Sequence, residues 1–204
     1  MREVTSVLLV GVGGQGTILA GTVLSNGLVA SGRDVKTSEI HGMAQRGGSV
    51  STQVRFGDKV HSPLIGRGGA DFLVGFEMME AARWIPFLKP GGRIVVNDLQ
   101  IAPAPVLMGR AEYPKDLLDV LHARFGATIV KAGAIAEEIG VPRVMNMVLF
   151  GAFVEVSQLT DINWDIVIAS TVKPAFLDAN IAAYRAGRRA AREAALPVEL
   201  AASA

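Results

Sequence analysis

The chain has no cysteine among its 204 residues. This absence excludes disulfide bonds and a thiol nucleophile, and it excludes an iron–sulfur cluster or a thiolate zinc site held by this chain alone. Basic and acidic residues nearly balance, 20 against 19, so no overall charge attracts nucleic acid or an anionic membrane surface. Because the chain has no cysteine to ligate an iron–sulfur cluster, we expect any electron-transfer centre to lie on another polypeptide.

Long apolar segments and targeting signals are also missing. No stretch offers the roughly 18 uninterrupted apolar residues of a membrane-spanning helix. The opening MREVTS precedes a short apolar run that ends in glycines rather than in a cleavage site. We therefore expect a cytoplasmic protein with neither a membrane nor a nucleic-acid partner. Only 19% of the residues are charged, which suggests that a partner subunit covers an apolar face.

Several catalytic motifs are absent as well. There is no H-E-x-x-H, no serine nucleophile elbow and no P-loop lysine, so nothing predicts a self-contained hydrolase or kinase. His61 and His122 stand far from any metal-ligand spacing and are interpreted as surface or packing histidines. We expect no metal site in this chain.

What the sequence does have is a glycine-rich turn near its start. The apolar run SVLLV leads into GVGGQG, with Gly11, Gly13 and Gly16 at G-x-G-x-x-G spacing, and a long helical pattern follows. Such a strand, turn and helix lets backbone N–H groups approach an anion at the positive end of the helix dipole. The turn therefore predicts contact with a phosphate-bearing ligand, or else it serves only for close packing.

The rest of a dinucleotide-binding fingerprint is incomplete. The acidic residue that would bind a ribose should follow about 20 residues later, and Glu39 is near that distance. However, Glu39 lies within SEIHGMAQRGGS, which has no long amphipathic pattern behind it. We therefore expect a variant of the NAD-binding Rossmann unit rather than the unit itself.

The densest polar segment of the chain includes that same stretch. It holds a carboxylate, an imidazole, an amide and a guanidinium, and two glycines then allow a sharp turn. The residues concerned are Ser38, Glu39, His41, Gln45, Arg46, Gly47 and Gly48. The guanidinium suits a carboxylate or a phosphate, and the imidazole could donate to an oxyanion or move a proton. A ligand-facing loop and an interface loop, with Glu39 paired to Arg46 or to a partner, both stay open.

Alternating strands and helices predict an α/β, three-layer, Rossmann-like domain with a mostly parallel sheet and a helical C-terminal third. The clean alternation of SVSTQVRF, the turn GD and the segment KVHSPLI predict an inserted antiparallel hairpin over residues 49–65. Strands are expected at 34–37, 71–76 and from Arg93, and a helix at about 77–88. Asn146, on an apolar helix, is interpreted as a satisfied buried amide. Residues 1–195 are expected to form one domain, and 196–204 a frayed tail.

The motifs GVGGQG, SEIHGMAQRGGSVSTQVRFG, VHSPLI and RVMNMVLFGAF together resemble one family. The chain is similar over residues 5–185 to the gamma-type subunits of 2-oxoacid:ferredoxin oxidoreductases, and most similar to their indolepyruvate branch. The resemblance implies an enzyme that decarboxylates a 2-oxoacid, forms the acyl-CoA and reduces ferredoxin or a related acceptor. An aryl pyruvate such as indolepyruvate is the first expectation for the substrate, and branched, phenyl or plain 2-oxoacids stay open.

The resemblance also implies which parts this chain lacks. Thiamine diphosphate, its magnesium ion and the iron–sulfur clusters belong to larger partner subunits, and this subunit is not expected to be active alone. It would help to enclose the active site and bind CoA as co-substrate. The motif positions carried over are Gly11, Gly13, Gly14, Gln15, Gly16, Ser38, His41, Gln45, Arg46, Gly47 and Gly48. The glycine loop and Arg46 would meet anionic groups, and His41 and Gln45 would donate hydrogen bonds.

Two alternatives stay open beside this interpretation. The chain could be a stand-alone oxidoreductase that binds NAD or a flavin at the glycine turn. It could equally be a structural partner subunit whose glycine turn contacts no ligand. Tight binding of a dinucleotide by the purified chain would favour the first alternative.

Overall fold

A computed structural model describes residues 3–42 and 47–195 of the chain. Six strands form one sheet in the order β2-β3-β1-β4-β5-β6. The strands are β1 (Thr5–Val12), β2 (Asp34–His41), β3 (Ser49–Gly57), β4 (Ala70–Gly75), β5 (Leu88–Asn97) and β6 (Thr128–Val130). The β1, β4, β5 and β6 pairings are parallel, whereas β3 runs antiparallel to both β1 and β2.

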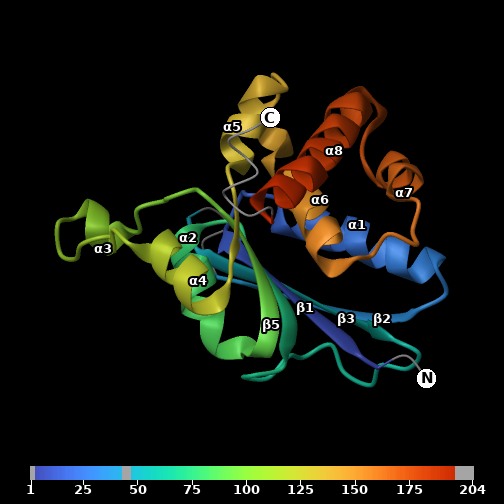
Figure 1. Ribbon diagram of the computed structural model, residues 1–204, viewed down its shortest axis with the longest axis horizontal. Helices are drawn as coiled ribbons and strands as arrows, with labels where there is room; N and C mark the ends of the chain where they lie inside the picture. The colour runs from blue at the N-terminus through green and yellow to red at the C-terminus, as the bar shows by residue number, and fades with distance from the viewer. Residues whose placement is uncertain (1–2, 43–46, 196–204) are drawn as a thin grey trace.

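Helices cover both faces of this sheet, which gives three layers (Figure 1). On one face lie α1 (Thr17–Ala30), α6 (Met145–Ser157), α7 (Trp164–Thr171) and α8 (Leu177–Ala194), with α5 (Ala132–Glu138) beside α6. On the other face lie α2 (Met78–Trp84) and α4 (Leu117–Phe125). The short α3 (Ala104–Leu107) stands out to one side. The expected fold class is therefore confirmed, including its helical C-terminal third.

Each face of the sheet has its own apolar core. Residues of β1 alternate between the two cores, since Val7 and Leu9 pack toward α1 and α6 while Leu8 and Val10 pack toward α2. Burial on both faces explains why β1 reads as an unbroken apolar run instead of an alternating one. The strand that was expected from SVLLV is thus the central strand of the sheet.

The antiparallel hairpin is where the sequence prediction was wrong. It consists of β2 and β3, and residues 58–69 form no strand. Because β1 and β2 occupy both edges of β3, no edge remains for residues 59–65, and Pro63 lacks the N–H that a ladder requires. The expected second strand at 34–37 extends instead to His41. The strand expected from Arg93 begins earlier, at Leu88, so the helix before it is shorter than predicted.

The helices that follow the neighbouring strands β1 and β4 lie on opposite faces of the sheet. After β1 the chain enters α1 on one face, and after β4 it enters α2 on the opposite face. In open α/β sheets such a point leaves a crevice at the carboxyl ends of the two strands, and ligands bind there. The glycine turn lies at this point.

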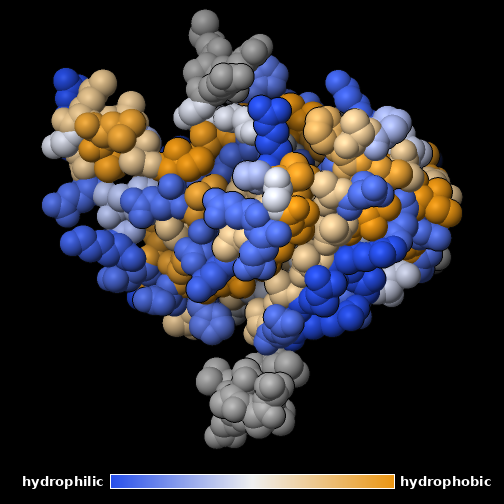
Figure 2. Space-filling view, turned by 90° about the horizontal axis from the view of Figure 1, so that it is seen from above, coloured by the Kyte–Doolittle hydropathy of each residue, from blue (hydrophilic) through white to orange (hydrophobic). Residues whose placement is uncertain are grey.

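Within the described residues, no helix is both long and apolar enough to cross a membrane. The α3 arm, residues 98–116, carries exposed apolar side chains at its tip, with Leu107 76% and Met108 65% exposed. Figure 2 shows this hydrophobic cluster at the left edge of the molecule.

Candidate functional site

The glycine loop, residues 11–16, joins the end of β1 to the start of α1. Gly14 and Gly16 have positive φ angles of 101° and 82°, which residues with a Cβ rarely adopt. Gly16 is the N-cap of α1. Among the described residues, no side chain forms a capping hydrogen bond there, and the first turn of α1 contains no acidic residue. The first N–H groups of a helix have no partner within the helix, so this end of α1 presents donors and a positive dipole end.

Hydrogen bonds fix the loop to the neighbouring strands. The N–H of Gly13 donates to the carbonyl of Gly48 at 2.8 Å. The Gln15 side chain accepts from the N–H of Val12 at 2.7 Å and donates to the carbonyl of Phe76 at 3.0 Å. Gln15 therefore bridges the ends of β1 and β4 across the crevice. Its carboxamide is engaged with the backbone on both sides.

Packing requires glycine at two positions of the loop. A Cβ on Gly11 would lie 2.6 Å from Oε1 of Gln15 and 2.8 Å from Cβ of Phe76. A Cβ on Gly16 would lie 2.5 Å from Nδ2 of Asn146. Both distances are shorter than real Cβ contacts, so close packing requires glycine at Gly11 and Gly16, and at Gly16 the backbone conformation requires it as well.

Asn146 reaches the loop from the start of α6, 130 positions along the chain from Gly16. It is 4% exposed at the start of α6, and its Nδ2 donates to the carbonyl of Gly16 at 3.4 Å. Its Oδ1 accepts from the N–H of Met147 at 2.9 Å. The interpretation of Asn146 as a satisfied buried amide is therefore confirmed, and the group that it satisfies belongs to the glycine loop.

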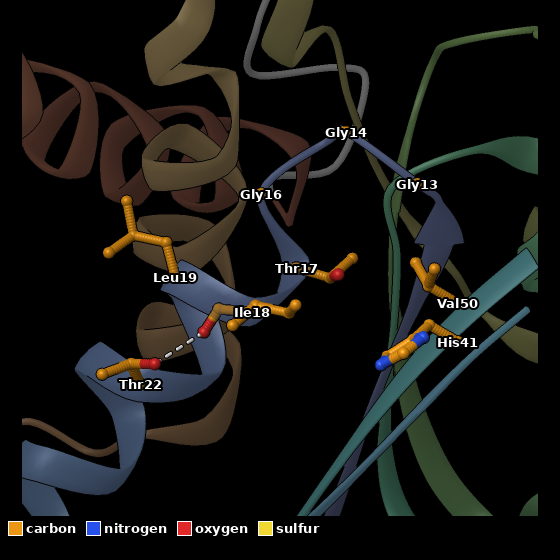
Figure 3. A pocket seen from close by; sticks show the side chains of 9 residues that line it. All are labelled: Gly13, Gly14, Gly16, Thr17, Ile18, Leu19, Thr22, His41 and Val50. Atoms are coloured by element: carbon orange, nitrogen blue, oxygen red, sulfur yellow. Dashed lines mark hydrogen bonds between the residues drawn. The ribbon is translucent and has the colours of Figure 1, made fainter. Parts of the chain in front are cut away.

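A cavity of about 610 Å³ opens beside the loop and is called the first cavity here. It lies between α1 and the ends of β2 and β3 (Figure 3). Its walls are Gly13, Gly14, Gly16, Thr17, Ile18, Leu19, Thr22, His41 and Val50. His41 ends β2 and faces the first turn of α1 across this space. Either ring nitrogen of a histidine can donate a hydrogen bond, depending on the tautomer.

The other predicted site residues do not all join this cavity. Ser38 is three residues from His41 on the same strand, so its side chain points to the opposite face of the sheet. Gly47 and Gly48 line a neighbouring cavity on the α2 side of the crevice. Gln45 and Arg46 lie outside the described residues. The structure thus brings His41 together with Gly13, Gly14 and Gly16, and it separates Ser38 from them.

The neighbouring cavity, of about 400 Å³, has two buried carboxylates in its wall. Glu77, 1% exposed, caps α2 and accepts from the N–H of Glu80 at 2.8 Å and from the hydroxyl of Tyr113 at 2.5 Å. Burial, and then the bond to Glu77, raise the pKa of the Tyr113 hydroxyl. Glu80 accepts from the Ser49 hydroxyl at 2.5 Å and pairs with Arg83 at 3.1 Å.

Neither carboxylate was predicted from the sequence. Glu77 follows the buried strand DFLVGF directly, at the carboxyl end where a parallel sheet places its ligand-side residues, and that position could have identified it. Glu77 also accepts from the N–H of Ile101 at 3.1 Å, so its hydrogen bonds fix the base of the α3 arm to α2. Among the described residues, no three histidine or acidic side chains gather as metal ligands would.

Fold and loop geometry together define a Rossmann-like α/β protein with a glycine-rich loop at its topological switch point. Residues 6–190 match the sequence model of the pyruvate ferredoxin/flavodoxin oxidoreductase family. The chain belongs to this family, as its motifs predicted. It is 36% identical over 194 residues to indolepyruvate oxidoreductase subunit IorB of Thermococcus kodakarensis, covering 92% of this chain and 96% of that one.

Solved structures share the fold. The gamma subunit of a keto/oxoacid ferredoxin oxidoreductase from Geobacter sulfurreducens superposes with a TM-score of 0.68 at 22% identity, over 92% of this chain and 98% of that one. The 2-oxoglutarate:ferredoxin oxidoreductase of Magnetococcus marinus, solved with 2-oxoglutarate, coenzyme A and succinyl-CoA, gives 0.70 at 21% identity. That alignment covers 97% of this chain but only 32% of the other, so the same fold forms about a third of a longer polypeptide there.

Proposed function

We propose that this chain is the small subunit of a CoA-acylating 2-oxoacid:ferredoxin oxidoreductase and that its first cavity receives part of CoA. Residues 1–195 act as a single gamma-type domain of a cytoplasmic complex. The substrate is an aryl pyruvate such as indolepyruvate, and ferredoxin or a related acceptor takes the electrons. The observation that carries the proposal is the glycine loop, whose helix N-terminus opens into a cavity of about 610 Å³ in a member of this family.

Larger partner subunits hold thiamine diphosphate, its magnesium ion and the iron–sulfur clusters. Thiamine diphosphate supplies the carbanion chemistry of decarboxylation. This chain has no cysteine with which to ligate a cluster, which supports that division. The names of its relatives support it too, since IorB of Thermococcus kodakarensis is a subunit of an indolepyruvate oxidoreductase.

The residues of this chain bind and orient. The backbone N–H groups of Gly14, Gly16 and Thr17 meet an anionic or carbonyl oxygen of CoA, because they lie at the positive end of α1. His41 donates a hydrogen bond from the other wall. Ile18 and Val50 give the cavity apolar walls that exclude water from the thiol arm. Gln15 holds the loop in place instead of contacting the ligand itself.

Strand order disfavours a dinucleotide-binding enzyme. In that class the strand that carries the ribose-binding acid lies beside the first strand. Here β3 lies between β1 and β2, so Glu39 is displaced by one further strand spacing, about 4.8 Å. A titration of the purified chain with NADH or FAD is expected to show no tight binding. Tight binding would favour the stand-alone oxidoreductase.

The test of the proposal fills the first cavity. Ile18 is 49% exposed and lines the cavity, so Ile18→Trp adds bulk there without disturbing the core. In the assembled complex this variant is expected to raise the KM for CoA about tenfold or more, while the KM for the 2-oxoacid changes less than twofold. Val29→Trp, on the same helix at 60% exposure and away from the cavity, is the matched control. An unchanged KM for CoA would favour a purely structural subunit.

A further inference from the structure

The α3 arm, residues 98–116, projects from the body of the molecule (Figure 1). Its middle part, residues 101–109 with the sequence IAPAPVLMG, contains no charged side chain. At the tip, Leu107 is 76% exposed and Met108 is 65% exposed. Apolar side chains gain free energy when another surface removes them from water. The tip therefore has the composition of a contact site rather than that of a solvated loop.

Hydrogen bonds hold both ends of the arm against α2. Near its start, the N–H of Ile101 donates to the Glu77 carboxylate at 3.1 Å. Near its end, the hydroxyl of Tyr113 donates to the same carboxylate at 2.5 Å and accepts from the N–H of Met79 at 3.2 Å. Glu77 is 1% exposed and Tyr113 is 8% exposed. Because a buried carboxylate keeps its hydrogen bonds, the tip is held in one position relative to the sheet.

The tip itself is ordered by proline and by local hydrogen bonds. Pro103 and Pro105 restrict the backbone on either side of the first turn of α3. The N–H of Leu107 donates to the carbonyl of Pro103 at 3.1 Å, and the N–H of Met108 donates to that of Ala104 at 2.9 Å. A segment that is ordered before binding loses less conformational entropy when it binds. The arm is thus a preformed apolar protrusion, which fits a concave surface.

The position of the arm indicates what covers it. Leu107 and Gly48 both line the neighbouring cavity on the α2 side of the crevice, and the carbonyl of Gly48 accepts from the N–H of Gly13 in the glycine loop. A protein that covers the tip therefore also lies against the crevice. In the Magnetococcus marinus enzyme this fold matches only 32% of one polypeptide, so a larger body of protein is covalently attached to it there.

A second copy of this chain fits the tip less well. A two-fold symmetric dimer places the same patch of both copies together, so two protruding tips would meet and neither would be covered. The recess beside the arm is a poor receptor for an apolar tip as well, because Glu77 and Glu80 lie in its wall. The observations therefore favour a different and larger polypeptide.

We propose that the α3 arm is the element by which this chain docks onto the larger thiamine-bearing subunit, with Leu107 and Met108 inserted into an apolar pocket of that subunit. Glu77 and Tyr113 hold the arm in the docking position. This inference rests on the proposed function, which supplies the identity of the partner. It adds that affinity between the subunits comes from the arm, whose tip contacts neither substrate nor CoA.

The test is a reconstitution of the complex from its subunits. The small subunit is titrated into the larger thiamine-binding subunit, and acceptor reduction is followed with saturating indolepyruvate and CoA. Leu107→Asp/Met108→Asp is expected to raise the half-saturating concentration of the small subunit about tenfold or more, because an apolar pocket cannot solvate a carboxylate. The activity at saturation should stay within about twofold of the unmodified value, because the tip contacts no reacting group.

The matched control is Val29→Asp/Ile166→Asp. These side chains are 60% and 66% exposed in α1 and α7, on the other face of the sheet from α2, and they receive the same two charges. The control should leave the half-saturating concentration unchanged. Both double variants alter exposed side chains only, so their midpoints of thermal unfolding should lie within about 2 °C of the unmodified subunit.

The outcomes separate docking from the proposed function. If the arm variant saturates at the same concentration as the unmodified subunit, the docking role is overturned while the proposed function stands. If the larger subunit needs no small subunit for activity, the proposed function itself fails.

Three further results would also overturn docking by the arm. The first is a control pair that weakens association as much as the arm variant does. The second is an arm variant that lowers only the activity at saturation, which would place the tip inside the active site. The third is an isolated chain that sediments as a dimer and dissociates when the tip is changed, because a second copy would then cover it.

Discussion

At the scale of single residues, the glycine loop is held by hydrogen bonds to residues far away in the sequence. Gln15 bridges two strands, and Asn146 meets the carbonyl of Gly16 from the start of α6. The glycine spacing itself was readable from the sequence, since strand, turn and helix followed in order. The partners of the loop were not readable, because a contact over 130 positions leaves no local pattern.

The crowding at Gly16 leads to a first prediction. Gly16→Ala must adopt a φ of 82° and also place its Cβ against Asn146, so we expect a loss of about 2–4 kcal/mol in the free energy of unfolding. Gly32→Ala has a similar φ of 79° but meets no heavy atom within 4 Å, and it should cost only about 1 kcal/mol. Urea unfolding of both variants measures the difference. Equal losses would show that Asn146 does not crowd the loop.

Ser38 shows what a single-residue interpretation could not supply. It was grouped with His41 because both belong to one polar stretch, and β2 was expected to end at Thr37. Since the strand continues to His41, alternation places Ser38 and His41 on opposite faces. A shift of four residues in a strand end thus decided which side chains could meet.

At the scale of elements, α6 and α8 make the closest helix contact of the described chain. A Cβ on Gly151 would overlap the carbonyl oxygen of Tyr184, and a Cβ on Gly187 would overlap that of Val148. The backbones therefore touch, and only glycine fits at either position. The sequence predicted a helical C-terminal third but not this crossing, because glycine in a helical pattern indicates only a weak helix former.

This contact makes a prediction with a built-in control. Gly187→Ala must separate two backbones, so we expect a loss of at least about 3 kcal/mol in the free energy of unfolding. Gly133→Ala, in α5, meets no heavy atom within 4 Å and should stabilise the chain by about 0.5–1 kcal/mol. Thermal unfolding of both variants tests the pair. A Gly187→Ala protein as stable as the unmodified chain would contradict the crossing geometry.

An ionic contact joins the same two helices. Glu155 accepts hydrogen bonds from Arg188 at 2.8 Å and from Arg192 at 2.7 Å. The bond from Arg192, and then that from Arg188, hold the pKa of the Glu155 carboxyl below its usual value. A lowered pKa in the folded state means that the unfolded chain takes up the proton first as the pH falls.

The stabilisation from Glu155 should therefore be complete above the usual carboxyl pKa of about 4.3 and disappear as the pH falls through the lower folded value. Glu155→Gln is expected to lower the midpoint of thermal unfolding at pH 7 by about 2–4 °C. The difference from the unmodified chain should vanish in strongly acidic buffer. A difference that persists there would show that the glutamate contributes by packing alone.

At the scale of the whole molecule, composition and alternation predicted the layered α/β class, and the central apolar strand positioned the glycine loop correctly. The mixed sheet order was not predictable from local pattern, since β3 finds its partners β1 and β2 on both sides by competition among all strands. A cavity of about 390 Å³ between α1 and the start of α8 was not predictable either, because its walls come from segments more than 100 positions apart, as Leu19 and Val141 are.

The two tyrosines of the chain give a test of the packing on both faces of the sheet. Burial raises the pKa of Tyr113 on the α2 side and that of Tyr184 on the α8 side. Because the unfolded chain ionises near the usual pKa of about 10, the tyrosines should destabilise the fold as the pH rises beyond that value. We expect no phenolate absorbance at pH ~10, and its appearance together with unfolding at higher pH. Phenolate formed without unfolding would contradict the burial.

The absence of cysteine and the proposed function together make a prediction for the purified subunit. It should contain no iron and no bound thiamine, whereas the assembled complex should contain both, as metal analysis and thiamine assay would show. The subunit by itself should reduce no acceptor with indolepyruvate and CoA. Activity from the isolated chain would contradict the proposal that partner subunits hold thiamine diphosphate and the iron–sulfur clusters.

The touching backbones of α6 and α8 also determine how the molecule opens. Asn146 begins α6 and contacts the glycine loop, while α8 is locked onto α6 further along. Amide protons of the two helices should therefore exchange with solvent at a common rate, as one cooperative unit, and the loop amides should lose their protection with them. Truncation of the chain before α8 is then expected to destabilise the glycine loop, which lies about 160 positions earlier in the sequence.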